Sequence, residues 1–255
     1  MSNVVRFFYK CFEVVHANTP ELIDEAYKLR YQVYCEEKGF EDAKQFPDGR
    51  EFDEYDRRAA HSLIRHRDSG VFVGVVRLVL PDRSDPSRLL PAERYCRLNS
   101  HPELAKLPRH SIGEISRFSI SKTFRRRIAE AGSISGIYRE EGANAASVHP
   151  RFDRRLLPHV NVGLIAALVH MCKEHGIQYC YAVMEPTLLR LLGRFGINFQ
   201  SVGQPVDCHG LRVPSFFAGD DLLAMMRKRP DIWPLIGADA LSFSQPQACR
   251  NLAVI

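Results

Sequence analysis

The spacing of hydrophobic and polar residues changes along the chain between strand-like runs and helical stripes, and each change marks an expected element. Residues 12–15 form a short apolar run typical of a strand. The sequence NTPE at 18–21 then supplies a cap residue, a proline for the first helical position and an acid for the first turn. A helix should follow and end at Gly39, because apolar residues recur at helical spacings at Leu22, Ala26, Leu29 and Val33.

Later apolar runs predict a sheet with further helices. In chain order we expect a hairpin with strands at 60–64 and 71–80, a strand at 113–121, a helix over 161–175, a strand at 177–184, a short helix over 186–195, strands at 198–206 and 211–217, and a terminal helix over 220–227 capped by Asp220. Residues 81–110 predict a connection with one short helix, and residues 129–149 an excursion rich in Gly, Ala and Ser. We therefore expect one domain over 1–255, with a core at about 12–217, insertions at 81–110 and 129–149, and a C-terminal helix and tail at 219–255.

The run at 113–121 is the candidate central strand, and it carries an acid and a base three residues apart. Because a regular strand has a period of two, Glu114 and Arg117 should point to opposite faces of the sheet. If both side chains serve one site, an extra residue must redirect one of them, and we expect a β-bulge near Ser116. The alternative is a surface ion pair on an edge strand.

The segment at 41–58 loses all periodicity and becomes acidic. It contains an E-x-D-x-x-D pattern at Glu51, Asp53 and Asp56. The segment also contains three aromatic residues, Phe46, Phe52 and Tyr55, which should hold it against the body of the protein as an ordered loop. No histidine or further acid stands at a ligand-like spacing, so recognition of a cationic amine is a better interpretation than a metal site.

Two arginines occur where a charge is unexpected. Arg30 and Tyr34 lie one helical turn apart beside the apolar stripe, so they can face a common cleft or remain a solvated arginine beside a packed tyrosine. Arg77 interrupts the apolar strand at 71–80. Because an unpaired buried charge is costly, Arg77 should either emerge at a cleft or pair with one of the acids.

The composition is that of an ordinary protein of 255 residues, with 45% hydrophobic and 25% charged residues. The seven cysteines are scattered without CxxC or CxxH spacing, which argues against a disulfide framework or zinc site and fits a reducing cytosol. We see no signal-peptide core and no apolar run long enough for a membrane span, and expect a cytoplasmic protein. The formal charge of +5 is concentrated in a basic set that suits an acidic partner: Lys122, Arg125, Arg126, Arg127, Arg151, Arg154 and Arg155.

The order of the expected elements resembles that of the Gcn5-related N-acetyltransferase superfamily. The charged motifs narrow this resemblance, because they are similar to the signature of the acyl-homoserine-lactone (autoinducer) synthases. They are also similar to those of the N-acyl amino acid synthases and of the PEP-CTERM/exosortase-associated acyltransferases. The motifs are Arg30 with Tyr34, the E-x-D-x-x-D pattern, Arg77 in an apolar strand, and E-x-x-R-F at Glu114, Arg117 and Phe118. The likeness covers about residues 12–217.

The resemblance implies an α/β (α+β) fold with a central mixed and mostly antiparallel twisted sheet, splayed at its central strands and flanked by helices. It also implies an acyltransferase in which an amine attacks an acyl thioester. The implied catalytic roles are Glu114 as base, Asp53 as the acid that orients the ammonium, and Arg77 in a network with Asp56 and Arg117. The residues implied at the substrate, with Arg30 suited to an acceptor carboxylate, are Arg30, Tyr34, Phe40, Glu51, Asp56, Arg117 and Phe118.

The donor implied is an acyl chain on the phosphopantetheine of an acidic acyl carrier protein, with no tightly bound cofactor or metal. Members of the superfamily that use CoA follow the central strand with a glycine-rich loop, whereas this chain continues as KTFRRR at 122–127. Acyl-CoA is the alternative donor. The chain also has Phe40 where the autoinducer synthases tend to have tryptophan, and it is longer. Both differences favour N-acylation of an amino acid or similar small amine over a homoserine-lactone product.

Two other functions and one other mechanism are also compatible with the sequence. The first is a lysine-type or small-amine acetyltransferase that uses acetyl-CoA. A nucleic-acid module is the second, although the basic run contains only Phe124 as an aromatic residue and the acidic segment would repel phosphate. A mechanism with Cys180 as nucleophile is the third, although buried cysteines are usually small hydrophobic residues.

Overall fold

An eight-stranded sheet forms the centre of the computed structural model, which describes residues 3–99, 102–122, 156–194 and 197–236. The strand order is β1-β2-β3-β4-β5-β8-β6, with the short β7 paired to β8. Only β4 and β5 run parallel, so the sheet is mostly antiparallel, as predicted. The strands are β1 (Phe12–His16), β2 (Ala59–His66), β3 (Phe72–Val79), β4 (Ile112–Ile120), β5 (Tyr179–Met184), β6 (Gln200–Ser201), β7 (Val206–Asp207) and β8 (Leu211–Ala218).

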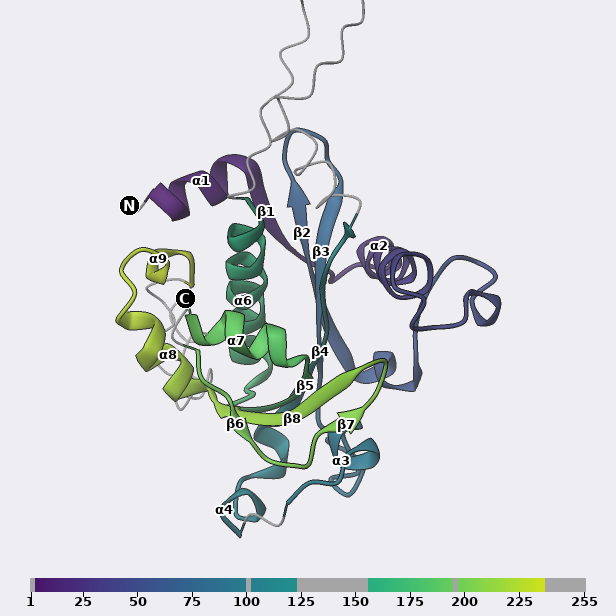
Figure 1. The fold of residues 1–255 in the computed structure, drawn as a ribbon, viewed down its shortest axis with the longest axis vertical. Helices are drawn as coiled ribbons and strands as arrows, with labels where there is room; N and C mark the ends of the chain where they lie inside the picture. Colours follow the sequence, from purple (N-terminus) through teal and green to yellow (C-terminus); the bar gives the residue numbers. More distant parts are fainter. Residues whose placement is uncertain (1–2, 100–101, 123–155, 195–196, 237–255) are drawn as a thin grey trace, which may run out of the picture.

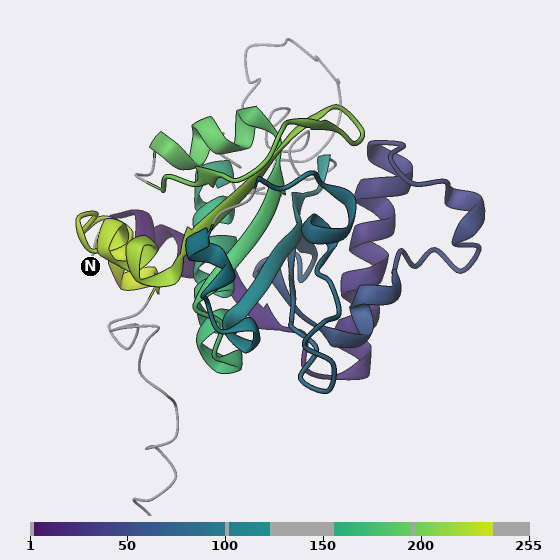
Figure 2. The ribbon, with the colours of Figure 1, turned by 90° about the horizontal axis from the view of Figure 1, so that it is seen from below.

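Helices cover both faces of this sheet (Figures 1 and 2). Helix α2 (Pro20–Tyr31) lies on one face and continues as a π-helical turn, η1 (Gln32–Glu37). Its N-cap is Thr19, whose hydroxyl accepts from the Leu22 N–H, and Pro20 opens its first turn, as predicted. Helix α6 (Leu156–His175) packs on the other face against β2 and β3. The remaining helices are α1 (Asn3–Cys11), α3 (Pro91–Tyr95), α4 (Pro102–Ala105), α7 (Pro186–Arg194), α8 (Gly219–Arg227) and α9 (Trp233–Ile236).

Helix α1 is absent from the sequence-based prediction. Its Val5 and Phe8 side chains are completely buried, and the helix packs on α6. The approach is close, because a Cβ at Gly163 of α6 would lie 2.4 Å from the Phe8 ring. The spacing of three residues between Val5 and Phe8 is typical of a helix, but the polar residues around them made the pattern too weak to predict one.

Three further expectations need correction. The 81–110 connection carries two short α-helices and a 3-10 turn, η4 (Arg109–Ser111), rather than one helix. The strand expected at 198–206 is broken into β6 and β7. Between them Gly203 pairs with Leu98 of the 81–110 connection, and the approach is so close that a Cβ at Gly203 would lie 2.7 Å from the Arg97 carbonyl oxygen. Ala218, not Asp220, is the N-cap of α8. The expected excursion at 129–149 and the tail beyond 236 lie outside the described residues.

The predicted bulge is present in β4. Val75 of β3 pairs with Ser119, but Arg77 pairs with Ser116, so β4 has one more residue than β3 over this stretch. Arg117 lies in this extra-residue stretch, and its backbone is in the left-handed region, with φ of 52°. A non-glycine residue in this region stores strain of about 1 to 3 kcal/mol, and such strain is commonly found at functional sites.

Strands β4 and β5 separate beside this bulge. Their parallel pairing runs from Ile112 with Tyr179 to Ile115 with Ala182 and then ends, although β4 continues to Ile120 and β5 to Met184. The next residues of both strands, from Ser116 and from Val183, line a pocket. The splay at the central strands is therefore confirmed, and it places unpaired backbone of β4 at the pocket wall.

Candidate active site

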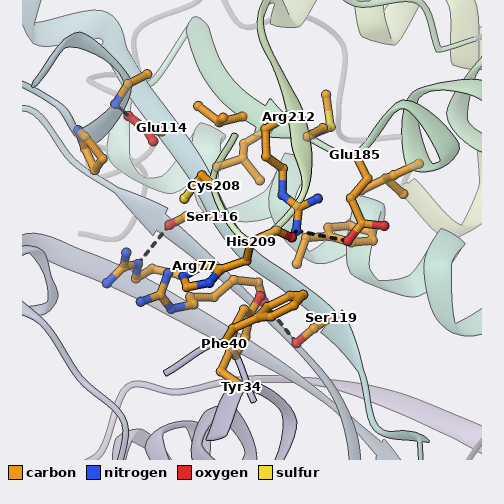
Figure 3. Close-up of a pocket in the computed structure, with 18 of the residues that line it drawn as sticks. Tyr34, Phe40, Arg77, Glu114, Ser116, Ser119, Glu185, Cys208, His209 and Arg212 are labelled. Atoms are coloured by element: carbon orange, nitrogen blue, oxygen red, sulfur yellow. Dashed lines mark hydrogen bonds and ion pairs between the residues drawn. The ribbon is translucent and has the colours of Figure 1, made fainter. Parts of the chain in front are cut away.

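The splayed strands open into a cavity of about 1220 Å³. Small-molecule sites usually measure about 300 to 1,000 Å³, so this one has room for two substrates together. One part of its wall is polar and comes from η1, the acidic segment and β4. Figure 3 shows Tyr34 of η1 and Glu114, Ser116 and Ser119 of β4 in this part. The other part is apolar and comes from α6, α7, the residues after α7, β8 and α8, through Ile165, Leu168, Leu188, Leu191, Leu192, Ile197, Phe199, Phe217 and Leu222.

A group of six charged side chains, which we call the ion-pair cluster, lies at the polar part: Arg30, Glu51, Asp53, Asp56, Arg77 and Arg117. Arg30 is completely buried in it. Its Nε donates to Glu51 at 2.7 Å, and its two terminal nitrogens donate to Asp56 at 2.6 and 3.0 Å. Neither Arg30 nor Asp56 lines the pocket. The expectation that both contact substrate is therefore wrong: Arg30 binds the acidic segment to α2 instead of an acceptor carboxylate.

Arg77 and Arg117 connect the ion-pair cluster to the bulge. Arg77 Nη1 donates to Asp53 Oδ1 at 2.7 Å and to Asp56 Oδ1 at 3.0 Å, while its Nε donates to the Ser116 hydroxyl at 2.9 Å (Figure 3). Arg117 Nη2 donates to Glu51 Oε1 at 2.7 Å and lies 3.4 Å from Asp53 Oδ2. The predicted network is thus present. Asp53 is its most exposed acid, with 30% of its side chain accessible.

The arginines keep the buried acids ionised. Burial by itself would raise the pKa of Glu51, but hydrogen bonds and charge from Arg117 and Arg30 lower it to about 2. Asp56 is affected in the same way, and its pKa falls far below the usual range. His61 Nε2 lies 3.3 Å from Asp56 Oδ1 without hydrogen-bond geometry, and burial lowers the pKa of this histidine. The neutral imidazole is therefore favoured, and the arginines supply the positive charge of the cluster, while the backbone N–H groups of Asp53 and Tyr55 donate further hydrogen bonds to Asp56 and Asp53.

Glu114 has the opposite environment. It is 3% exposed and forms no ion pair with a described residue; its Oε2 accepts a hydrogen bond from the Ala92 N–H at 2.7 Å (Figure 3). Burial raises its pKa to about 8, against the opposing effects of the Ala92 hydrogen bond and the Arg77 charge. Glu114 and Arg117 line the same pocket, as the bulge was expected to allow. A carboxyl group with a pKa near the working pH can exchange protons with a substrate.

Aromatic residues bridge the pocket between η1 and the turn at 207–210. Phe40 stacks on His209 at 5.0 Å, and Arg212 of β8 lies over the same Phe40 ring and pairs with Glu185 at 3.2 Å. The Tyr34 hydroxyl bonds to Ser119, and Arg117 lies 4.9 Å from the centre of the Tyr34 ring. Tyr34, Phe40 and Phe118 were expected at the substrate, and all three line the pocket.

Several lining residues were not anticipated. Ser116 and Ser119 follow from the bulge, but no sequence signal connects His209 or Arg212 with Phe40, because they are about 170 residues apart. The apolar part of the wall was also missed, because its residues are spread over three helices, a strand and the residues after α7, and each of these segments has an ordinary core pattern. Helical or strand periodicity shows that such a residue is buried, not what it faces.

Other candidates lie elsewhere. Cys180 is 1% exposed, does not line the pocket, and has its Sγ 3.7 Å from that of Cys172. Burial and the neighbouring thiol raise its pKa well above the usual value, which makes it a poor nucleophile. Lys122 donates from both its ammonium and its backbone N–H to Glu37. The six arginines expected beside it for carrier docking lie outside the described residues.

Comparisons with known proteins agree with this geometry. Residues 29–134 match the family model described as an acetyltransferase (GNAT) domain. The fold is that of a GNAT acyltransferase. TofI, in a ternary complex with an inhibitor and MTA, superposes with a TM-score of 0.54 and 21% identity, over 85% of this chain and 96% of its own. No curated protein matches the sequence significantly.

Two further solved structures superpose over most of the GNAT fold. The CoA-dependent acyl-homoserine lactone synthase BjaI, with SAM and isopentyl-CoA, gives a TM-score of 0.52 with 20% identity, over 87% of this chain and 91% of its own. FeeM, an N-acyl amino acid synthase from uncultured soil microbes, gives 0.51 with 12% identity, over 84% and 93%. At these identities the likeness shows the fold alone, and the acyltransferase class rests on the domain match over residues 29–134.

Within the described ranges, no helix combines the length and apolar character needed to cross a membrane. No group of three or more His, Cys, Asp or Glu side chains in the same ranges is arranged to hold a metal ion.

Proposed function

We propose that this protein is an N-acyltransferase that moves a fatty acyl group from the thioester of an acyl carrier protein to the amine of an amino acid or similar small acceptor. The observation that supports it most is one pocket lined by both a buried acid and a set of apolar side chains. Glu114 and Asp53 lie at its polar part, and Leu188, Leu192 and Phe217 belong to its apolar part. An amine and an acyl chain therefore have separate environments that meet at β4.

The chemistry follows from the groups at this meeting point. Asp53, held by Arg77 and Arg117, orients the incoming ammonium. Glu114 in its ionised form removes a proton from it, directly or through a water molecule. The neutral nitrogen attacks the thioester carbonyl, the C–N bond forms, and backbone N–H groups on the unpaired edge of β4 stabilise the oxyanion. The C–S bond then breaks, the nitrogen loses its second proton as the amide forms, and the leaving thiolate takes up a proton.

The choice of donor rests on charge. The sequence KTFRRR follows β4 where CoA-using relatives have a glycine-rich loop, and it suits an acidic carrier protein better than a pyrophosphate. Acyl-CoA is the alternative donor, and BjaI is described as CoA-dependent. An acyl-homoserine lactone synthase is the alternative function, because BjaI is such an enzyme and was solved with SAM.

The test is to supply the purified protein with acyl groups from two to sixteen carbons, on carrier protein and on CoA, together with a mixture of amines. Mass spectrometry then identifies the products. We expect N-acyl amides as products, with long acyl chains preferred over acetyl, because an acetyl group is too short to contact the apolar part of the pocket. Exclusive use of acetyl-CoA would contradict the proposal and favour a small-amine acetyltransferase. Formation of a lactone from SAM would favour the synthase alternative.

A charge-reversal experiment tests the carrier. Replacing Arg125 and Arg126 by glutamate should raise the apparent KM for the acyl-carrier donor about tenfold or more, because basic charges steer an acidic partner. Added salt should weaken the wild type more than the variant. Activity with a short acyl-pantetheine donor, which has no acidic helix, should stay within about twofold of wild type. Equal losses with both donors would mean that these arginines support the pocket itself.

A further inference from the structure

The cationic side chains that line the pocket are already occupied. Within the described part of the chain they number four: Lys38, Arg77, Arg117 and Arg212. Arg77 and Arg117 are held by the acids of the ion-pair cluster, and Arg77 is only 2% exposed. Arg212 pairs with Glu185, and the Lys38 ammonium lies over the Tyr34 and Phe40 rings, at 5.4 and 5.0 Å from their centres. A substrate carboxylate would have to displace one of these partners.

Carboxylates outnumber these cations in the same wall, and three of them remain partly exposed. The seven acidic side chains that line it are Glu41, Glu51, Asp53, Glu54, Glu114, Glu185 and Asp207. Glu41, Asp53 and Glu54 keep 32%, 30% and 49% of their side chains exposed. Asp53 Oδ2 lies 3.4 Å from Arg117 Nη2, a long contact, so it can still accept a strong hydrogen bond from an ammonium group.

Aromatic rings surround these acids. Phe46 and Phe52 of the acidic segment line the pocket and contact each other edge to face at 6.2 Å. Phe52 and Tyr95 are more than half exposed at its rim. Exposed aromatic faces combined with carboxylates recognise organic cations, and they give no favourable interaction to an anionic group.

We propose that the acceptor is a primary amine without a carboxylate, of the alkylamine or arylalkylamine class, rather than an α-amino acid. This inference rests on the proposed N-acyltransferase function and narrows its acceptor. A zwitterionic amino acid would bring its carboxylate among Glu41, Asp53 and Glu54, where the described cations are engaged. A decarboxylated amine brings only the positive charge that these acids attract and a body that the rim aromatics can contact.

Matched substrates test this directly. The pairs tyramine and tyrosine, and cadaverine and lysine, differ only in the carboxylate. With the full-length enzyme and one long-chain donor, kcat/KM should be at least about tenfold higher for the amine of each pair, a difference that one desolvated charge readily produces. Tyrosine methyl ester separates charge from size: it should behave like tyramine, because its carboxylate is masked. Tyrosine or lysine used as well as its amine, or a methyl ester as poor as tyrosine, would overturn the inference.

Two further measurements keep this test separate from that of the proposed function. Glu41→Lys should lower the preference for tyramine over tyrosine about tenfold, whereas Glu103→Lys, at a fully solvated position on α4 outside the pocket, should leave it unchanged. An equal preference in all three proteins would contradict the inference. Thermal shifts with tyramine and tyrosine need no turnover. If no amine is acylated from any donor, the proposed function fails, and a larger shift with tyrosine would then reject the inference on its own.

Discussion

Replacing Glu114 by glutamine is expected to lower kcat at least about a hundredfold, because the buried carboxylate is the base for the attacking amine. Asp53→Asn should cause a loss of similar size, because the amide cannot attract the ammonium as a carboxylate does. In wild type, kcat/KM should rise with pH and level off above about 8, where Glu114 is ionised. The Glu114→Gln enzyme should lack this limb. Steady-state kinetics from pH 6 to 9.5 measure both effects.

The stability of Glu114→Gln provides the control. The folded-state pKa of Glu114 is about 8, above its ordinary value of 4.5, so between these values the folded protein holds a proton that the unfolded chain releases. Ionisation of Glu114 therefore costs stability progressively as pH rises toward 8. Because glutamine cannot ionise, the variant should melt at a temperature equal to or higher than that of wild type, with the difference growing from pH 5 to pH 8. Near-normal turnover in both the Glu114 and Asp53 variants would remove this site assignment.

Arg77→Ala and Arg117→Ala are each expected to destabilise the fold by about 3 to 5 kcal/mol. Each substitution removes one of the two arginines that a carboxylate of the ion-pair cluster contacts: Asp53 loses Arg77 in the first case, and Glu51, which is 1% exposed, loses Arg117 in the second. A buried carboxylate that loses part of its counter-charge is costly because water cannot solvate it. Chemical denaturation measures the loss, and a fall in soluble yield would be its first sign.

Arg94→Ala is the matched control for these two substitutions. Arg94 forms an ion pair with Glu54 at 2.8 Å, but both side chains are about half exposed. Exposed pairs contribute about 0 to 1 kcal/mol, so this variant should unfold at nearly the wild-type denaturant concentration. If Arg77→Ala and Arg117→Ala were as stable as Arg94→Ala, the cluster would not hold the acidic segment.

One feature of the site, the bulge in β4, was predictable from the sequence. An acid and a base three residues apart in a strand predicted an extra residue near Ser116, and the register shift to Ser119 confirms it. That inference needed only the period of a strand. The same reasoning could not assign the bulge to Arg117 with its positive φ, because the local sequence carries no glycine to mark the position.

The environment of Arg30 could not be predicted from the sequence. Its position beside the apolar stripe of α2 fits a solvated face, a cleft or a buried pair equally well. The structure selects the buried pair, because the acidic segment folds back over α2 and brings Glu51 and Asp56 to the guanidinium. Three arginines and three acids allow many pairings, and only the path of the segment between them decides which form.

The sequence alone determined the order of most elements between Phe12 and Ala218 and the start of α2 at Thr19 and Pro20. It also determined which charged groups lie at the site, since each of these features depends on neighbours within a few residues. Tertiary structure decided the rest. The apolar part of the pocket forms because α6, α7 and β8 come together beside the splayed strands. The pKa of Glu114 is raised because this packing excludes water and places no counter-charge within ion-pair distance among the described residues. Burial and charge pairing depend on contacts between residues far apart in the chain, and periodicity along the sequence contains no information about them.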